Sequence, residues 1–241
     1  MRMIRIAAPS NILFHVTVFC VFAALTGSTQ AQTVHHQTKR RTMSSTGSLL
    51  HPASLHATAP AVYYVKFHTT KGDFTMEVTR AWAPHGADRF YNLVEHHFYD
   101  DATLFRVVPH FVVQFGIPAD PRYGRIWNNA NIKDDPVKES NLAGYVTYAQ
   151  SSAPNSRSTQ VFINYGDNSR LDSMGFAPFA KVVEGMSVVE SFYGGYADQP
   201  TGLQDRIVNQ GNAFLEKNFP KLDKIITARI VPAPAHPTGS Q

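Results

Sequence analysis

The sequence predicts a mainly-β domain over residues 61–232, a closed antiparallel barrel capped by two helices. Many short runs of β-branched and aromatic residues, separated by turn residues, indicate the strands. Only two stretches carry apolar residues at helical spacing, and helices do not alternate with strands as they would in a βαβ fold. The range contains neither an internal repeat nor a second domain boundary.

The first expected elements are a β-hairpin and a helix. Aromatic and β-branched residues fill 62–67 and 74–78, and Lys71-Gly72 provides a tight turn between them. A helix is expected to begin at Pro84, because apolar residues then recur every three to four positions. Its apolar face consists of Ala87, Phe90, Tyr91 and Val94.

Six more strands and one more helix complete the expected fold. Pro109-His110 joins the first two of these strands in a turn, and the second helix is expected to start after Gly185. The six strands are expected at Leu104–Val108, Phe111–Phe115, Gly144–Ala149, Val161–Asn164, Phe179–Val183 and Ile225–Val231.

We expect residues 1–31 to be a secretory signal peptide. Two arginines precede an apolar stretch from Ile12 to Leu25, and Thr29 and Ala31 then place small side chains where a signal peptidase cleaves. The apolar stretch is shorter than the roughly 20 residues of a membrane-spanning helix. An uncleaved anchor or a buried helix are the alternatives.

Cleavage after Ala31 would remove Cys20, the only cysteine. The mature protein is then expected in the periplasm or outside the cell, as a monomer without stable membrane insertion. Residues 32–60 are rich in Ser, Thr, His, Ala and Pro, so we expect a disordered linker there, and a disordered tail over 233–241.

The basic character of the chain is confined to its N-terminal part. A net charge of +4 and a pI near 9.2 would suit an acidic partner such as nucleic acid. Residues 1–60, however, contain five of the 22 basic residues and none of the 18 acidic ones, so residues 61–241 have a net charge of −1. We therefore expect no nucleic-acid partner for the domain.

Two neighbouring expected strands place an arginine and a glutamine among apolar side chains. Alternation puts Arg106 on the face of its strand opposite Phe105 and Val107, and puts Val112 and Gln114 on one face of the next strand. The opposite face of that strand is expected to carry Phe111, Val113 and Phe115. The alternative is an exposed arginine and glutamine on a solvated sheet face.

Several separated motifs occur in a fixed order along the chain. The arginine strand leads into Phe-x-x-Gln-x-Gly, and Gln-x-Phe-Ile-Asn, Leu-Asp and Phe-Ala-Lys-Val-Val-Glu-Gly-Met follow. From Val62 to Val231 this pattern resembles the cyclophilin family of peptidyl-prolyl isomerases, and its Gly-Asp-Asn-Ser-Arg-Leu-Asp loop resembles the bacterial members. The resemblance implies an eight-stranded barrel that isomerises X–Pro bonds in polypeptides, without metal or cofactor.

The resemblance also implies the site residues. Arg106 would be the catalytic arginine, and Gln114 would hold both this arginine and the substrate backbone. The backbone of Gln150, a position where the family more often has Asn or Arg, would grip the residue before the proline, and Ala149 and Ser151 would line the same groove. The proline pocket would consist of Phe111, Val112, Phe162 and Leu171, with Phe176 in place of a rim histidine.

The sequence departs from the family pattern at several positions. Phe105 replaces a histidine, Val112 a methionine, and Arg170 a tryptophan that familiar eukaryotic members use to bind cyclosporin. The resemblance therefore does not extend to cyclosporin sensitivity. Residues Tyr193–Phe219 resemble a branch-specific insertion, to which the sequence assigns no role.

An arginine beside an apolar pocket suits X–Pro isomerisation. In the twisted transition state the proline nitrogen regains a lone pair, and a permanently charged guanidinium can donate to it. A non-catalytic proline-peptide binding or chaperone module is the alternative function, although a pure binder does not need such a donor. The sequence contains no Ser/His/Asp arrangement or metal-ligand spacing that would indicate hydrolytic or metal chemistry.

Overall fold

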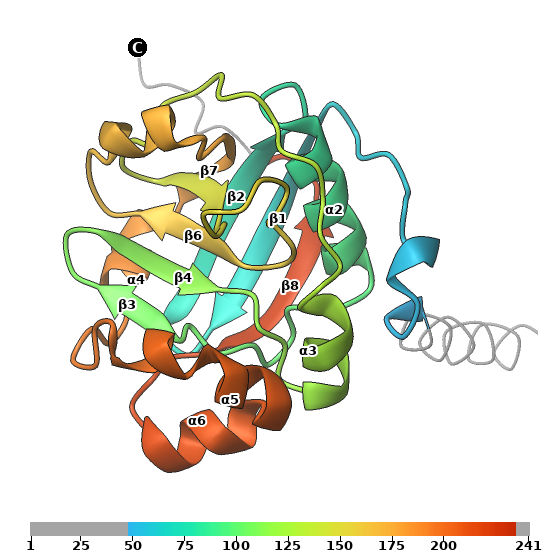
Figure 1. The fold of residues 1–241 in the computed structure, drawn as a ribbon. Coiled ribbons are helices and arrows are strands. Elements are labelled where there is room, and N and C mark those ends of the chain that lie inside the picture. The colour runs from blue at the N-terminus through green and yellow to red at the C-terminus, as the bar shows by residue number, and fades with distance from the viewer. Residues whose placement is uncertain (1–47, 235–241) are drawn as a thin grey trace, which may run out of the picture. The chain divides into compact units, whose positions relative to one another are not determined.

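A computed structural model describes residues 48–234, which form one eight-stranded antiparallel sheet with helices around it (Figure 1). The spatial order of the strands is β3-β4-β6-β5-β7-β2-β1-β8. The predicted antiparallel fold class is thereby confirmed. The strands are β1 (Val62–Thr69), β2 (Gly72–Thr79), β3 (Arg106–Val108), β4 (Val112–Phe115), β5 (Tyr145–Tyr148), β6 (Val161–Asn164), β7 (Pro178–Glu184) and β8 (Ile225–Val231).

The sheet is strongly curled, but no continuous ladder closes it within residues 48–234, where β3 and β8 are the two edges. The residues just before these strands meet in an isolated antiparallel bridge between Thr103 and Lys224. Beside it, the Leu104 amide donates to the Asp223 carbonyl at 2.9 Å. The expected closed barrel is therefore a curled sheet whose edges are joined at one end only.

Aromatic side chains fill the inside of the curled sheet. Phe67 and Phe74 face each other across β1 and β2 and stack with 4.7 Å between ring centroids. Phe115 of β4 meets Phe67 edge-on at 5.8 Å. Phe90 lies 5.0 Å from Phe179 of β7, so the same core joins the sheet to the helix that carries Phe90. Rings of this size supply much of the apolar area buried on folding.

Both predicted helices are present. Helix α2 (Pro84–Glu95) begins at the expected proline and buries the face that carries Ala87, Phe90 and Val94. Helix α4 (Met186–Glu190) follows Gly185, whose φ of 75° is the left-handed conformation that glycine adopts without strain. A Cβ at this position would also lie 2.4 Å from the Asp73 carbonyl oxygen, so glycine is required twice over.

Three short helices were not predicted from the sequence. Each spans seven residues, about two turns, and lies in a stretch to which the sequence assigned no helix or strand. They are α3 (Pro121–Trp127), α5 (Gln204–Gln210) and α6 (Asn212–Asn218). Packing stabilises them: α3 approaches α5 so closely that a Cβ on Gly124 would lie 2.6 Å from the Val208 carbonyl oxygen.

Helices α5 and α6 cover a second apolar cluster, beside the main core. Phe105 lies fully buried in this cluster, whereas Val107 packs in the main core. Phe105 and Val107 are both buried, whereas Arg106 and Val108 are partly exposed, which agrees with the predicted alternation even though β3 begins at Arg106 rather than at Leu104. The second cluster consists of Phe105, Ile117, Ile207, Val208, Phe214, Leu215, Phe219 and Leu222.

The folded region begins upstream of the expected start at residue 61. Leu49 is 3% exposed, and its carbonyl accepts a hydrogen bond from Trp127 Nε1 at 2.8 Å. The Asn92 side chain of α2 binds both the amide (3.1 Å) and the carbonyl (2.7 Å) of Ala57. The expectation of disorder is therefore wrong for residues 48–60, where backbone hydrogen bonds that leave no sequence pattern fix the chain.

The structure does not test the other expectations for the two ends of the chain. The expected signal peptide, the first part of the linker and most of the expected tail lie outside the described residues. Among the described residues, no helix has both the length and the apolar character that a membrane crossing requires.

Leu49→Ala tests whether the upstream segment contributes to the fold. Because this side chain is almost fully buried, we expect the free energy of unfolding in urea to fall by about 2–3 kcal/mol. The neighbouring Leu50 is 43% exposed and provides a matched control, for which alanine should cost under about 0.5 kcal/mol. Equal, small effects of the two substitutions would show that the segment adds no stability.

Candidate active site

The β3–β4 hairpin places Arg106 directly opposite Gln114. In the antiparallel register Arg106 pairs with Gln114 and Val108 with Val112. The turn between the strands is tight because His110 adopts a positive φ of 63°. Arg106 Nη1 donates to Gln114 Oε1 at 3.2 Å, so the expected contact between the two side chains is present.

An apolar cluster lies next to this pair on the face of the sheet that points away from the core. Val112, Phe162 and Leu171 are its buried members, and Phe111, Ala149 and Phe176 are partly buried against them. The Phe162 and Phe176 rings meet edge-to-face at 5.8 Å. The structure thus brings together all five residues expected in the proline pocket, along with Ala149.

Phe111 lies on the opposite side from the one predicted by alternation. It packs in the apolar cluster, whereas Val113 and Phe115 point into the main core. The alternation fails because β4 begins at Val112, so Phe111 belongs to the turn.

The Phe111 ring contacts two arginines. The Arg106 Cζ lies 5.4 Å from the ring centroid and the Arg170 Cζ lies 4.8 Å from it, both within the range of cation–π attraction. The Arg106 side chain is 22% exposed, which leaves it partly shielded from water. An aromatic ring that belongs to the apolar cluster therefore also helps to orient the candidate catalytic arginine.

A polar cavity of about 270 Å³ adjoins the apolar cluster at Ala149. No charged side chain of residues 48–234 lines it. The expected groove residues Gln114, Ala149, Gln150 and Ser151 lie in its wall. Its other lining residues, which sequence reasoning missed, are Asn128, Ser156, Ser158, Gln160 and Gln204.

A chain of side-chain hydrogen bonds runs from Arg106 along the wall of this cavity. Gln114 Nε2 donates to Gln160 Oε1 at 2.8 Å, and Gln160 Nε2 donates to Gln204 Oε1 at 3.0 Å. Because each amide donates away from the arginine, the Gln114 carbonyl oxygen is left to accept from Arg106. Arg106 has a second partner outside this series of amides, because its Nε donates to Asp198 Oδ1 at 2.6 Å.

A second polar network holds the wall that carries Leu171 and Phe176. The fully buried Asn141 donates to Asp172 Oδ1 from both its backbone and its side chain, at 3.0 and 2.7 Å, and also to the Phe176 carbonyl at 2.8 Å. Burial raises the pKa of Asp172, but these bonds and one from Ser140 outweigh it and hold the pKa below its usual range. The charged carboxylate thus fixes the 3₁₀ helix Ser169–Met174 under the apolar cluster.

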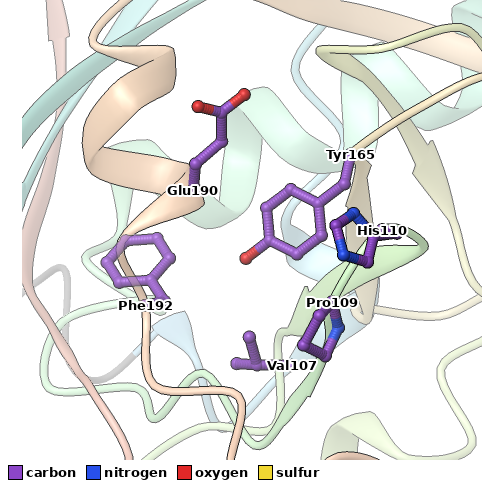
Figure 2. A pocket seen from close by; sticks show the side chains of 6 residues that line it. All are labelled: Val107, Pro109, His110, Tyr165, Glu190 and Phe192. Atoms are coloured by element: carbon purple, nitrogen blue, oxygen red, sulfur yellow. The ribbon is translucent and has the colours of Figure 1, made fainter.

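Another cavity, of about 370 Å³, lies between α4 and the β3–β4 hairpin (Figure 2). Val107, Pro109 and His110 of the hairpin face Glu190 and Phe192 across it, with Tyr165 between them. The Tyr165 hydroxyl donates to the Val189 carbonyl at 2.9 Å. No member of the apolar cluster and no expected site residue lines this cavity, so it is separate from the candidate active site.

The fold has a counterpart among solved structures. A crystal structure of a cyclophilin type peptidyl-prolyl cis-trans isomerase from Cryptosporidium parvum matches with a TM-score of 0.52 and 17% identity, over 72% of this chain and 99% of that chain. The curled sheet with its helices is therefore a cyclophilin-like fold, the architecture of a class of peptidyl-prolyl isomerases.

Sequence comparison identifies the family. The family model described as "Cyclophilin type peptidyl-prolyl cis-trans isomerase/CLD" matches residues 64–212. A peptidyl-prolyl cis-trans isomerase of Acinetobacter baylyi is 31% identical over 73% of this chain and 89% of its own length, and peptidyl-prolyl cis-trans isomerase B of Escherichia coli is 29% identical over 67% and 95%. The chain belongs to the cyclophilin-type peptidyl-prolyl cis-trans isomerase family and acts on proline-containing peptides.

Asp172→Asn tests the network beneath the apolar cluster. A folded-state pKa below the ordinary value of about 3.9 means that the carboxylate stabilises the fold above that pH and loses this contribution as the pH falls through the folded pKa. We expect the variant to lose about 2 kcal/mol of unfolding free energy at pH 7. The difference from the wild type should shrink as urea unfolding is repeated from pH 6 down to pH 2.5; a difference that does not change with pH would contradict this role.

Proposed function

We propose that Arg106 and the apolar cluster together perform the isomerisation. The observation that carries this proposal is that Phe111 contacts both parts of the site. Its ring packs in the apolar cluster, and the Arg106 guanidinium, which bonds to Gln114, lies over the same ring. A proline ring seated on the cluster would therefore lie beside the arginine.

The reaction needs a donor at one nitrogen atom rather than a proton transfer. Rotation about an X–Pro bond breaks amide resonance, with a barrier of about 18–20 kcal/mol. As the bond twists, the nitrogen regains its lone pair and becomes a hydrogen-bond acceptor. Within residues 48–234 the Nη2 group of Arg106 makes no hydrogen bond, so it can donate to this nitrogen. Such a contact is stronger in the transition state than in the planar ground state, which is the condition for catalysis.

The polar cavity suits the peptide on the other side of the proline. Its lining of amide and hydroxyl groups offers donors and acceptors to a peptide backbone. The absence of charged side chains in this lining favours an uncharged residue before the proline. The apolar cluster would hold the proline ring in place. The peptide segment before the proline would then rotate in the polar cavity.

Arg106→Ala tests the assignment of the catalytic residue. Loss of a single preorganised transition-state donor costs on the order of 100-fold in kcat, and we expect a loss of this size for isomerisation of a proline peptide measured by NMR exchange. Binding of the peptide should weaken much less, because the apolar cluster remains.

Arg170→Ala is the matched control. It removes the other arginine on the Phe111 ring, and we expect its kcat to stay within about threefold of the wild type, in line with a single cation–π contact. Full activity of Arg106→Ala would refute the mechanism. A wild-type protein that binds the peptide without accelerating exchange would favour the non-catalytic binding module instead.

We further propose that the enzyme assists the folding of exported proteins in the periplasm or outside the cell. The basic and apolar pattern of residues 1–31 supports this location, and residues 32–241 contain no cysteine that an oxidising compartment would affect.

Expression of the full chain in a Gram-negative bacterium tests this location. Cell fractionation and N-terminal sequencing should find the protein in the periplasm or the medium, beginning at Gln32. A protein that keeps Met1 and stays in the cytoplasm would contradict both the export and the proposed class of substrates.

A further inference from the structure

Residues Tyr193–Phe219 lie against the strand that carries Arg106. Val107 of β3 forms an isolated antiparallel bridge with Ala197. In an antiparallel pairing the next residue of one strand faces the preceding residue of the other, so this bridge sets Asp198 opposite Arg106. The approach is close, because a Cβ on Gly194 would lie 2.9 Å from Pro109 Cγ.

The bridge brings a carboxylate to the guanidinium. Arg106 Nε donates to Asp198 Oδ1 at 2.6 Å, a short charge-assisted bond. The Asp198 side chain is 60% exposed, so this bond adds little to the stability of the fold. We expect the bond to matter because it orients the guanidinium of Arg106.

Two contacts define the plane of the guanidinium. With Gln114 alone on Nη1, the group could still turn about the bonds that lead to it. A second partner on Nε fixes the plane, because the guanidinium is rigid and its donors have fixed directions. The Nη2 group then points in one direction.

The same segment also holds the other partner of Arg106. Gln204, the first residue of α5, accepts from Gln160, which in turn accepts from Gln114. Helix α5 is anchored through Ile207 and Val208 in the second apolar cluster. That cluster also buries Phe105, the residue before Arg106, so the segment and the arginine share one rigid support.

We propose that residues 193–219 complete the active site, with Asp198 acting as the positioning residue for Arg106. Asp198 accepts the Nε hydrogen and aims the Nη2 group at the proline nitrogen, while Gln204 fixes the amide chain from the other side. The proposal rests on the catalytic role of Arg106 argued above, and it assigns a role to residues 193–219, to which the sequence alone assigned none.

The test compares Asp198→Ala with Asp198→Asn in the full-length protein, with kcat and KM measured separately on a proline peptide. Alanine removes the acceptor, and we expect kcat to fall about tenfold with KM within about twofold, because a misdirected donor affects only the transition state. Asparagine keeps an acceptor oxygen and should restore kcat to within about threefold of the wild type.

Asp205→Asn is the matched control, because it removes an exposed carboxylate of the same segment for which no side-chain hydrogen bond or ion pair is seen among residues 48–234. It should match the wild type in kcat. Unchanged kcat in Asp198→Ala, or equal losses in the alanine and asparagine variants, would overturn the positioning role.

A spectroscopic measurement and a double variant separate this proposal from the proposed function. The Nε–H signal of Arg106 should be sharp and slowly exchanging in ¹⁵N NMR spectra of the wild type and of Asp198→Asn, and broadened by exchange in Asp198→Ala. In an Arg106→Ala background, Asp198→Ala should cause no further loss of kcat, whereas an additional tenfold loss would contradict the proposal. Full activity of Arg106→Ala alone would instead refute the proposed mechanism, whatever Asp198 does.

Discussion

The pairing of Arg106 with Gln114 across β3 and β4 is the contact on which the candidate site depends. A long cationic side chain on a sheet face has many rotamers, and each of them would leave the guanidinium in a different place. The adjacent strand removes this freedom, because its register brings an amide oxygen to within 3.2 Å of Nη1. The backbone ladder of the hairpin thereby sets the place of the candidate catalytic arginine.

The hairpin itself is fixed by three apolar clusters that it connects. Val107 and Val113 point into the main core, Val112 lies in the apolar cluster of the site, and Phe105 lies in the second cluster under α5 and α6. A shift of one residue in the register would move each side chain to the wrong face and expose it to water. Burial on every side of a short hairpin therefore holds the polar groups more firmly than their own hydrogen bonds could.

The parts of this structure that the sequence could predict are those with a local pattern. Period-two alternation located the strands, and it placed Arg106 and Gln114 where they lie. The resemblance to cyclophilins supplied Phe162 and Leu171, which no local pattern connects. Asp198 was out of reach, because it meets Arg106 across 92 residues and an exposed aspartate in a loop carries no signal of its partner. The ordered contacts of residues 48–60 were missed for a similar reason, since they are made by backbone groups.

The order of the strands also bears on how the chain reaches its native state. β1, near the start of the domain, pairs with β8 at its end, and beside them Thr70 bonds to Asp223 across 153 residues. Until the last strand has been synthesised, β1 has no partner on one side and presents a row of unpaired backbone groups. Pairing over such a separation has a large loop-closure entropy, which slows folding in domains dominated by non-local contacts. The sheet of this isomerase is thus completed only when β8, its last strand in chain order, reaches β1, its first.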